Sequence, residues 1–375
     1  MKNKKALVIT FIDPYERSGA TNRLESITKR YSDLYDVDVL HIFSNKKKRF
    51  QQLWSGRNKI SEISENYKIT RLLKSFFRSF SFLSNRVAVL DDSVFNHYKY
   101  IICHTSRSFL ALSPQMRKKV IHIDVCDNLV KGYRRTSFYF FLANPFLAFA
   151  YFYESVLEYC ILRSVNEGVS ISYITNNDIP TWLGNRNNVI CFPNFYNFES
   201  ISNELSHFDS DSVRIGLVGN FRTILNNQIL KSLLKYKFPF KHEICLFGQI
   251  PEKKEFPSDL NIYGEYEDLL SIKNLFDIGY CCSPLQAGIQ NKVIDYLFLN
   301  KPILIDEAVY ASFANDEYYK ILMESPLVLR NISSLLGFNS NKKNNDELHV
   351  ACLNKFVKMN ESYLKNKLHR VNTAC

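Results

Sequence analysis

The stretch Cys282–Ile305, CSPLQAGIQNKVIDYLFLNKPILI, reads as a strand end, a polar loop, a helix and a second strand. Ser283–Pro284 ends the first strand, and the helical pattern begins near Gln290–Asn291. A loop that opens a helix after a parallel strand presents free backbone N–H groups and the positive end of the helix dipole. The pattern therefore predicts that this loop, which contains Gly288, is a seat for a diphosphate.

The predicted helix has two chemically distinct faces. Lys292 and Asp295 share one face, while the apolar residues Val293, Ile294 and Leu297 share the other and can pack on a sheet. A cation suits phosphate, and a carboxylate suits sugar hydroxyls. The same two residues also fit an i,i+3 surface ion pair, and the local pattern leaves both interpretations open.

Length and composition indicate a two-domain globular protein. The chain of 375 residues is too long for one ordinary core, and 46% hydrophobic with 23% charged residues is typical of a folded protein. The nine cysteines include no CxxC pair and no Cys/His cluster with metal-ligand spacing. Reduced thiols are the simplest interpretation, and no metal is expected. The apolar run at 6–12 predicts a first strand rather than a signal peptide. The chain contains no 18-residue uncharged apolar run, so no membrane-spanning helix is predicted.

The net charge of +11 is concentrated in one segment, because 46–86 contains eleven Lys or Arg against Glu62 and Glu65. Apolar residues recur at helical spacing over 67–84, with Lys68, Arg71, Lys74 and Arg78 on the opposite arc. This amphipathic helix either packs on its own domain or lies on an anionic membrane surface. No recognised nucleic-acid-binding motif accompanies the charge, so no nucleic-acid partner is expected.

Apolar runs alternate with helical patterns along the whole chain. Strands are predicted at 6–12, 37–43, 100–104, 120–125, 169–174, 189–192, 213–218, 243–247, 261–263, 277–281 and 303–305. This alternation predicts an α/β protein with doubly wound parallel sheets. The polar segment 199–212 separates the two halves. We predict an N-terminal domain over 1–205, a C-terminal domain over 206–345, and a helical tail over 346–375 that is a candidate to return to the first domain.

Polar residues stand where several predicted strands end. The first strand leads into a loop with Gly19 and Arg23, which lacks GxGxxG and GKS/T and so does not support a dinucleotide or Walker site. His104, Asp124 and Asp127 follow the strands at 100–104 and 120–125, where an open parallel sheet gathers its ligands. We predict that these three groups meet the substrate. Alternatively, His104 is structural and Asp127 caps the next helix.

These turns, taken in order, resemble those of the GT-B glycosyltransferases, and specifically the family 4-like "glycosyl transferases group 1". The most specific match is Gly288–Pro302, which is similar to the family's "GiqnKvlEymalgkPvv". Further matches are the glycine loop at 18–23, the VDxxD-type strand end at 122–127, the strand at 172–178, the turn at 192–194 with Phe195 where glycine is usual, the "GnmryxpN" turn at 219–227, and the "aDvxvxPl" strand at 276–285.

The resemblance implies two Rossmann-like domains facing each other across a cleft. The C-terminal domain would hold a nucleotide-sugar, and the N-terminal domain would hold the acceptor. Lys292 and Arg222 would neutralise the diphosphate, and Asp295 takes the place of the family's ribose-binding Glu. Ala287 stands where many members carry a second acidic residue. The predicted donor-binding residues are Gly19, Arg23, Gly219, Arg222, Gly288, Gln290, Asn291, Lys292 and Asp295, and the predicted catalytic residues are His104, Asp124 and Asp127.

The function that the resemblance implies is glycosyl transfer in bacterial cell-surface polysaccharide biosynthesis, such as lipopolysaccharide, O-antigen or capsule. We expect a nucleotide-sugar donor, a lipid-linked saccharide acceptor, retention of anomeric configuration, and no metal or other cofactor. The basic segment 67–84 favours a cytoplasmic protein that is peripheral on the inner membrane face. Two alternatives stay open: a GT-B-fold nucleotide-sugar epimerase, and a membrane-associated scaffold that has lost catalysis, as Ala287 and the short Asp295 would allow.

Overall fold

The computed structural model describes residues 4–12, 19–43, 60–64, 95–110, 112–126, 145–194, 212–221, 224–250, 257, 260–266, 269–282, 290–331 and 342–373. The chain divides into two compact units. Unit 1 comprises Met1–Tyr196 with Leu364–Cys375, and unit 2 comprises Asn197–Tyr363. The boundary lies a little before the predicted one at 205/206, and the tail 346–375 is shared between the units. The basic segment 67–84 and the polar segment 199–211 lie outside the described residues.

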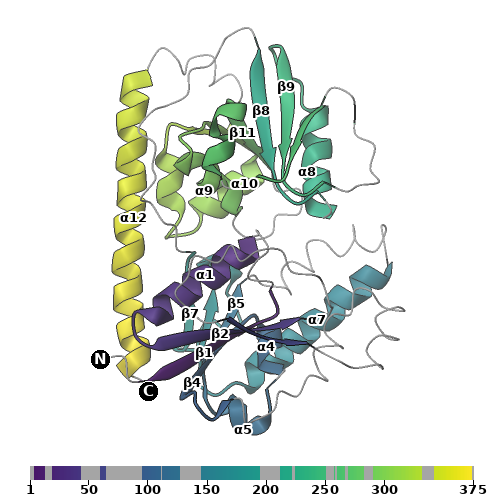
Figure 1. The fold of residues 1–375 in the computed structure, drawn as a ribbon. Helices are drawn as coiled ribbons and strands as arrows, with labels where there is room; N and C mark the ends of the chain where they lie inside the picture. The colour runs from purple at the N-terminus through teal and green to yellow at the C-terminus, as the bar shows by residue number, and fades with distance from the viewer. Residues whose placement is uncertain are drawn as a thin grey trace. The chain divides into compact units, whose positions relative to one another are not determined.

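Unit 1 is built on a seven-stranded parallel sheet in the order β3-β2-β1-β4-β5-β6-β7 (Figure 1). Its strands are β1 (Lys5–Thr10), β2 (Asp36–Phe43), β3 (Ile60–Ser64), β4 (Tyr100–His104), β5 (Val120–Cys126), β6 (Ser170–Tyr173) and β7 (Val189–Cys191). The central strands β1, β4 and β5 are almost wholly buried, which explains their continuous apolar runs. The sequence did not predict β3, because its five residues ISEIS contain only two apolar positions, spaced by three, and lie inside a basic segment.

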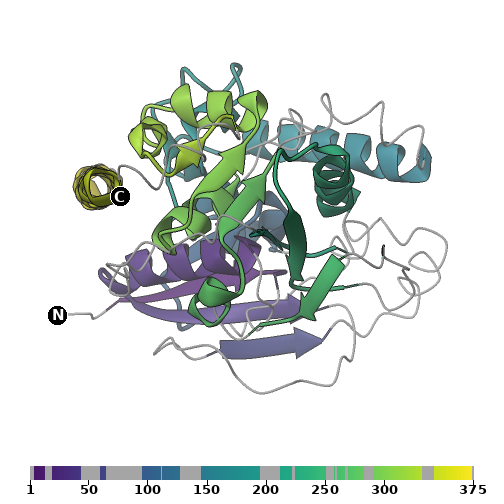
Figure 2. The same ribbon diagram turned by 90° about the horizontal axis from the view of Figure 1, so that it is seen from above.

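The helices of unit 1 are α1 (Gly19–Ser32), α4 (Ser106–Leu110), α5 (Pro114–Arg117), α7 (Pro145–Ser164) and the short 3₁₀ turn η2 (Asn176–Asp178). Helix α1 packs on β1 and β2 and buries Leu24, Ile27 and Tyr31, as the helical pattern predicted (Figure 2). Helix α7 begins at Pro145, because proline is tolerated in a first turn where no backbone donor is needed. The aromatic sequence before Pro145, from Tyr139, also has a composition that favours a helix, and it lies outside the described residues.

Unit 2 contains a six-stranded parallel sheet in the order β10-β9-β8-β11-β12-β13. Its strands are β8 (Val213–Val218), β9 (His242–Phe247), β10 (Leu260–Gly264), β11 (Ile278–Cys281), β12 (Ile303–Ile305) and β13 (Val328–Leu329). Counted from its first strand, this is the 3-2-1-4-5-6 order of the Rossmann fold. The sequence did not predict β13, since two residues are too few to show a strand pattern.

The helices of unit 2 are α8 (Ile224–Lys235), η3 (Leu270–Leu275), α9 (Asn291–Phe298), α10 (Glu307–Ala314) and η4 (Lys320–Glu324). Helix α12 (Lys342–Thr373) continues from unit 2 into the last residues of unit 1, and Figure 1 shows it as one unbroken helix. The predicted apolar pattern of this helix holds at Cys352 and Phe356, which are buried, whereas Leu348 is 52% exposed. Among the described residues, no helix is long and apolar enough to cross a membrane.

Gly279 allows α9 to lie close against the sheet of unit 2. Gly216 makes room for Phe276, whose ring packs on Tyr296 of α9. A Cβ atom on Gly279 would lie 2.6 Å from the ring of Tyr296, and one on Gly216 would lie 2.5 Å from the ring of Phe276. The Tyr296 hydroxyl donates to Gly216 O at 3.1 Å and accepts from the N–H of Val218 at 2.9 Å. These contacts fix the start of α9 beside the ends of β8 and β11.

Candidate functional site

In an open parallel sheet, ligands bind at the carboxyl ends of the strands where the strand order reverses. That point lies between β8 and β11 in unit 2, and between β1 and β4 in unit 1. The described candidate residues lie near these strand ends, so each unit contains a candidate site of its own. Arg222 and Gly288 of the predicted donor site, and the predicted catalytic Asp127, lie outside the described residues.

The end of β8 is a place where only glycine fits. Gly219 follows this strand, and a Cβ atom on it would lie 2.9 Å from both the Asn226 amide and Lys292 Nζ. Gly248 follows β9 with φ 122°, and a Cβ atom there would lie 2.1 Å from Gly219 O. The positive φ and the close approach both require glycine at 248. The Lys292 amine and the Asn226 amide therefore lie directly against the backbone at the end of β8.

Lys292 is directed to the end of β8. It is the second residue of α9, and its Nζ donates to Asn226 Oδ1 near the start of α8. The Asn226 amide in turn donates to Asn220 O at 2.9 Å, which fixes the orientation of the amide. Burial lowers the pKa of Lys292. An anion placed beside this amine would add to the favourable effect of the nearby Asp295 and offset the burial of the charge.

Asp295 lies one turn further along α9 and is half-buried. Burial raises the pKa of its carboxyl to about 7, against the opposing effect of the nearby Lys292 charge. The carboxylate makes no hydrogen bond or ion pair with the part of the chain that the structure describes. Lys292 and Asp295 are thus not the surface ion pair that the sequence left open. The carboxylate is an acceptor available to a ligand.

Gln290 and Asn291 begin α9 as predicted. Gln290 occupies the N-cap position and its side chain makes no capping hydrogen bond. The free backbone N–H groups of this first turn form the positive end of the helix dipole. With Gly219, Asn226, Lys292 and Asp295, unit 2 therefore combines backbone donors, one cation and one open carboxylate at its switch point. This set suits a phosphate bound beside a hydroxylated ring.

In unit 1, Arg23 and Asp124 form a buried ion pair. The Arg23 side chain is 1% exposed, and it donates from Nε to Asp124 Oδ2 at 3.0 Å and from NH2 to Oδ1 at 2.5 Å. It also donates to Phe192 O and to Asn194 Oδ1. Arg23 therefore joins α1 to the ends of β5 and β7. The sequence predicted Arg23 as a donor-binding residue, and the structure instead directs its guanidinium to Asp124.

Asp124 accepts further hydrogen bonds from Ser172 Oγ at 2.6 Å and from Cys126 Sγ at 2.9 Å. Burial alone would raise its pKa, but the charge and hydrogen bonds of Arg23 outweigh burial and hold the pKa well below the ordinary range. The carboxylate therefore stays ionised at neutral pH and has little tendency to accept a proton. This geometry suits a residue that positions its neighbours.

A chain of hydrogen bonds supports Asp124 from behind. Ser172 uses its only hydrogen on Asp124, so the His122 Nε2–H must donate to Ser172 Oγ, at 2.8 Å. His122 Nδ1 then accepts from the Tyr31 hydroxyl at 2.7 Å. Burial lowers the pKa of His122 to about 4, so the ring is neutral in this chain. The sequence did not reveal this network, because its members come from α1, β5 and β6.

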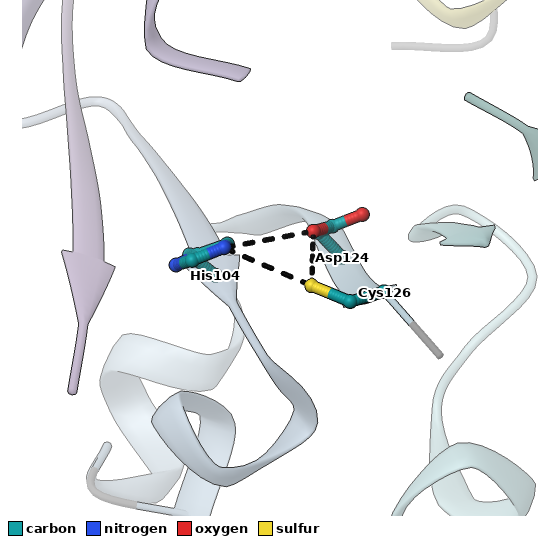
Figure 3. Close-up of side chains that lie close together, drawn as sticks. All are labelled: His104, Asp124 and Cys126. Carbon is teal, nitrogen blue, oxygen red and sulfur yellow. Dashed lines mark hydrogen bonds and ion pairs between the residues drawn. The ribbon is translucent and has the colours of Figure 1, made fainter. Parts of the chain in front are cut away.

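His104 lies at the end of β4 beside the switch point of unit 1. Its Nδ1 is 2.9 Å from Thr10 Oγ1 on β1, and its Nε2 is 3.9 Å from Asp124 Oδ2 and 3.7 Å from Cys126 Sγ (Figure 3). Burial lowers the pKa of His104 to about 4, so this ring is also neutral. Of the predicted catalytic residues, the structure thus brings His104 and Asp124 together.

The backbone is left-handed at both strand ends, with φ 72° at Thr105 and φ 66° at Cys126. Such conformations cost roughly 1–3 kcal/mol in residues other than glycine and gather at functional sites. Hydrogen bonds hold them here, from Thr105 N to Asp124 O at 2.8 Å and from Ile174 N to Cys126 O at 3.1 Å. Cys126 was not among the predicted site residues. Its place two residues after Asp124 was the available signal, because both side chains then leave the same face of the strand.

No protein-family model and no curated protein sequence matches the chain, whereas solved structures do. HepE of Anabaena, solved with UDP and glucose, has a TM-score of 0.59 at 11% identity and covers 97% of this chain and 99% of its own. Sucrose-phosphate synthase of Thermosynechococcus elongatus has a TM-score of 0.59 at 9% identity, and the match covers 99% of this chain and 98% of the synthase. The lipopolysaccharide outer core galactosyltransferase WaaB has a TM-score of 0.53 at 10% identity, and the match covers 99% of this chain and 100% of WaaB. These similarities confirm the predicted GT-B fold.

Proposed function

We propose that the protein is a glycosyltransferase that takes a sugar from a nucleotide-sugar, with the nucleotide bound by unit 2. The observation that carries this proposal is that the Lys292 amine and the Asp295 carboxylate, which makes no hydrogen bond with the described residues, both lie at the switch point between β8 and β11. Structures with the same fold support the nucleotide-sugar donor, since HepE was solved with UDP-glucose and with UDP and glucose.

In this proposal the diphosphate lies against Gly219 and the first turn of α9. Lys292 neutralises its charge, which grows as the sugar–phosphate bond breaks, so the cation stabilises the transition state more than the ground state. Arg222 is the predicted second cation. Because these side chains supply the positive charge, the proposed transfer uses no metal at the diphosphate. The Asp295 carboxylate accepts from the ribose hydroxyls.

Unit 1 holds the acceptor and the transferred sugar in this proposal. The Arg23–Asp124 pair is a positioning element that fixes α1 and the strand end next to His104. His104 is neutral, and through its ring nitrogens it can orient a sugar hydroxyl without adding charge. Asp127 remains the predicted base for the acceptor hydroxyl. The family resemblance supports transfer with retention of configuration.

The acceptor that we propose is a lipid-linked saccharide of bacterial cell-surface polysaccharide biosynthesis, reached from the inner face of the cytoplasmic membrane. The sequence observation behind this is the basic amphipathic pattern at 67–84, which suits an anionic membrane surface. WaaB, a lipopolysaccharide outer core galactosyltransferase with the same fold, is consistent with such an acceptor.

Transfer to lipid tests this function. The full-length protein is incubated with UDP-, GDP- and TDP-sugars labelled in the sugar, together with anionic vesicles that contain lipid-linked saccharide. We expect label in the lipid fraction and an equal release of nucleoside diphosphate. Label that stays on the nucleotide as an isomerised sugar would indicate the epimerase alternative. Tight donor binding without any turnover would indicate the scaffold alternative.

The membrane arm of this experiment uses a charge-matched pair of variants. Changing Lys68, Arg71, Lys74 and Arg78 to Gln is expected to weaken sedimentation with anionic vesicles about 10-fold or more, because each surface cation contributes roughly 1 kcal/mol. The control changes four exposed lysines of unit 2 to Gln, namely Lys231, Lys235, Lys237 and Lys241. Equal loss of sedimentation in both variants would contradict a membrane role for 67–84.

A further inference from the structure

Three side chains with different donor atoms meet where β4 and β5 end. His104 Nε2, Asp124 Oδ2 and Cys126 Sγ all lie within 4.8 Å of one another (Figure 3). His104 and Asp124 are fully buried, and Cys126 is half-buried. Within the described part of the chain, this is the one group of three such side chains. We propose that these three residues bind a Zn²⁺ ion.

The separations suit zinc. Cys126 Sγ lies 3.7 Å from His104 Nε2 and 2.9 Å from Asp124 Oδ2, and the nitrogen and oxygen are 3.9 Å apart. A point equidistant from the three atoms is then about 2.1 Å from each, and zinc bonds are about 2.0–2.1 Å to nitrogen, 2.0–2.2 Å to oxygen and 2.3 Å to sulfur. This point lies in the plane of the three atoms, so tetrahedral coordination requires the ion to move out of that plane and the three ligand atoms to shift with it.

The tautomer of His104 directs a lone pair to this point. The Thr10 hydroxyl donates to Ile12 O at 3.5 Å and accepts from Ile12 N at 2.9 Å. Thr10 Oγ1 lies 2.9 Å from His104 Nδ1, and zinc binding selects the tautomer in which Nδ1–H donates to this oxygen. The Nε2 lone pair of His104 therefore faces Asp124 and Cys126. A histidine whose other nitrogen is held in this way is the usual arrangement of a metal ligand.

The other two ligands are also held from outside. Asp124 Oδ1 accepts from Arg23 at 2.5 Å and from Ser172 at 2.6 Å, while Oδ2 accepts from Arg23 Nε at 3.0 Å and from Cys126 Sγ at 2.9 Å. The register of β5 against β6 shifts between Asp124 and Cys126, and Cys126 takes the left-handed conformation there. This departure from regular strand geometry brings Sγ to Oδ2. The ligand set is thus preorganised by the strand ends themselves.

Zinc would take the place of one proton. The thiol of Cys126 donates to Asp124 Oδ2, and binding converts Cys–SH and Zn²⁺ into Cys–S⁻–Zn²⁺ and a released H⁺. Arg23 Nε keeps its own bond to Oδ2 at 3.0 Å, so the ion pair persists. One nitrogen, one oxygen and one sulfur suit zinc, whereas Mg²⁺ and Ca²⁺ require several oxygen ligands. Three protein ligands leave one position for water.

Cobalt spectroscopy on the full-length protein tests the site. After chelator treatment, Co²⁺ is expected to give a thiolate-to-metal charge-transfer band at one ion per chain, which Zn²⁺ abolishes with release of one proton per ion. Cys126→Ser is expected to remove the band and to weaken zinc binding at least about 100-fold, and Thr10→Val, which frees the His104 ring, to weaken it about 10-fold. Cys160→Ser, at an exposed cysteine of α7, is the matched control and retains the band.

Three outcomes would overturn the zinc site: a band that survives Cys126→Ser, cobalt binding without a thiolate band, or saturation only at millimolar metal. Cys126→Ser is nearly isosteric, and an unchanged melting temperature shows that it folds. His104→Gln gives a second variant in which the band must also disappear. The zinc site shares His104 and Asp124 with the proposed transfer, but cobalt binding is measured without donor or acceptor, so its failure is distinguishable from failure of the transfer.

Discussion

Replacing Lys292 by Met is expected to weaken nucleotide-sugar binding about 10–100-fold and to lower kcat/KM about 100–1,000-fold. The weaker binding reflects the loss of a charge-assisted hydrogen bond to phosphate. The larger loss in kcat/KM also includes the lost stabilisation of the charge that develops on the leaving group. Methionine keeps the length of the side chain and removes only the cation. Isothermal titration with the donor and steady-state kinetics measure the two effects.

The fold should tolerate this substitution, because burial already disfavours the charged form of Lys292. The matched control is Lys235→Met at the exposed end of α8, which removes one positive charge from the same unit away from the switch point. Donor affinity equal in the two variants would contradict the diphosphate role of Lys292. A lower melting temperature in Lys292→Met alone would point to a structural role.

Breaking the Arg23–Asp124 pair is expected to have the largest effect on stability. Asp124→Asn leaves the Arg23 charge buried without its counter-ion, and such changes cost about 3–5 kcal/mol of the free energy of unfolding. The double variant Arg23→Met with Asp124→Leu removes both charges. Its free energy of unfolding is expected to fall by less than that of Asp124→Asn alone. Denaturant unfolding of the single and double variants forms the mutant cycle.

The exposed pair Arg330–Glu307, at 2.6 Å, provides the control for this cycle. Both of its side chains are more than half exposed, so Arg330→Met should leave the unfolding midpoint unchanged. If Asp124→Asn is no more destabilising than Arg330→Met, Arg23 and Asp124 do not form the buried lock described for unit 1. Additive effects of the two single changes, Arg23→Met and Asp124→Leu, would contradict it equally.

The same network makes unit 1 sensitive to acid. The pKa values of His104 and His122 fall to about 4 from an unfolded value of 6.5, so their stabilising contribution is complete above 6.5 and declines as the pH falls towards 4. The pKa of Asp124 is also lowered, so its contribution is lost at still lower pH. The free energy of unfolding should therefore begin to fall below pH 6.5.

Strand positions and the α9 motif could be predicted from the sequence because each is local. The apolar runs of β4, β8 and β12 are long or pure enough to mark their own ends. The spacing of Lys292 and Asp295 on α9 likewise follows from helix geometry. The assignment of both residues to a nucleotide site stays a prediction, and it came from the family resemblance because the local pattern also fitted a surface ion pair.

What the sequence could not predict is which strand ends become neighbours. Arg23 and Asp124 are far apart in the chain, and their contact follows from the sheet order, in which β5 lies beside β4 and the arginine reaches across from α1. Cys126 joins His104 for the same reason, and a search for metal-ligand spacing along the chain does not register ligands from adjacent strands. Gly248 is required because Gly219 O lies against it and because its φ is 122°.

The central claim is that unit 2 binds a nucleotide-sugar, and a thermal titration with UDP-, GDP- and TDP-sugars tests it most directly. We predict that one donor, at 100 times its Kd, stabilises the protein by about 2.7 kcal/mol and raises the melting temperature by about 5–10 °C. Binding should also tighten as the pH rises through 7, because the Asp295 carboxyl then ionises and can accept from ribose hydroxyls. No shift with any nucleotide-sugar at any of these pH values would contradict the claim.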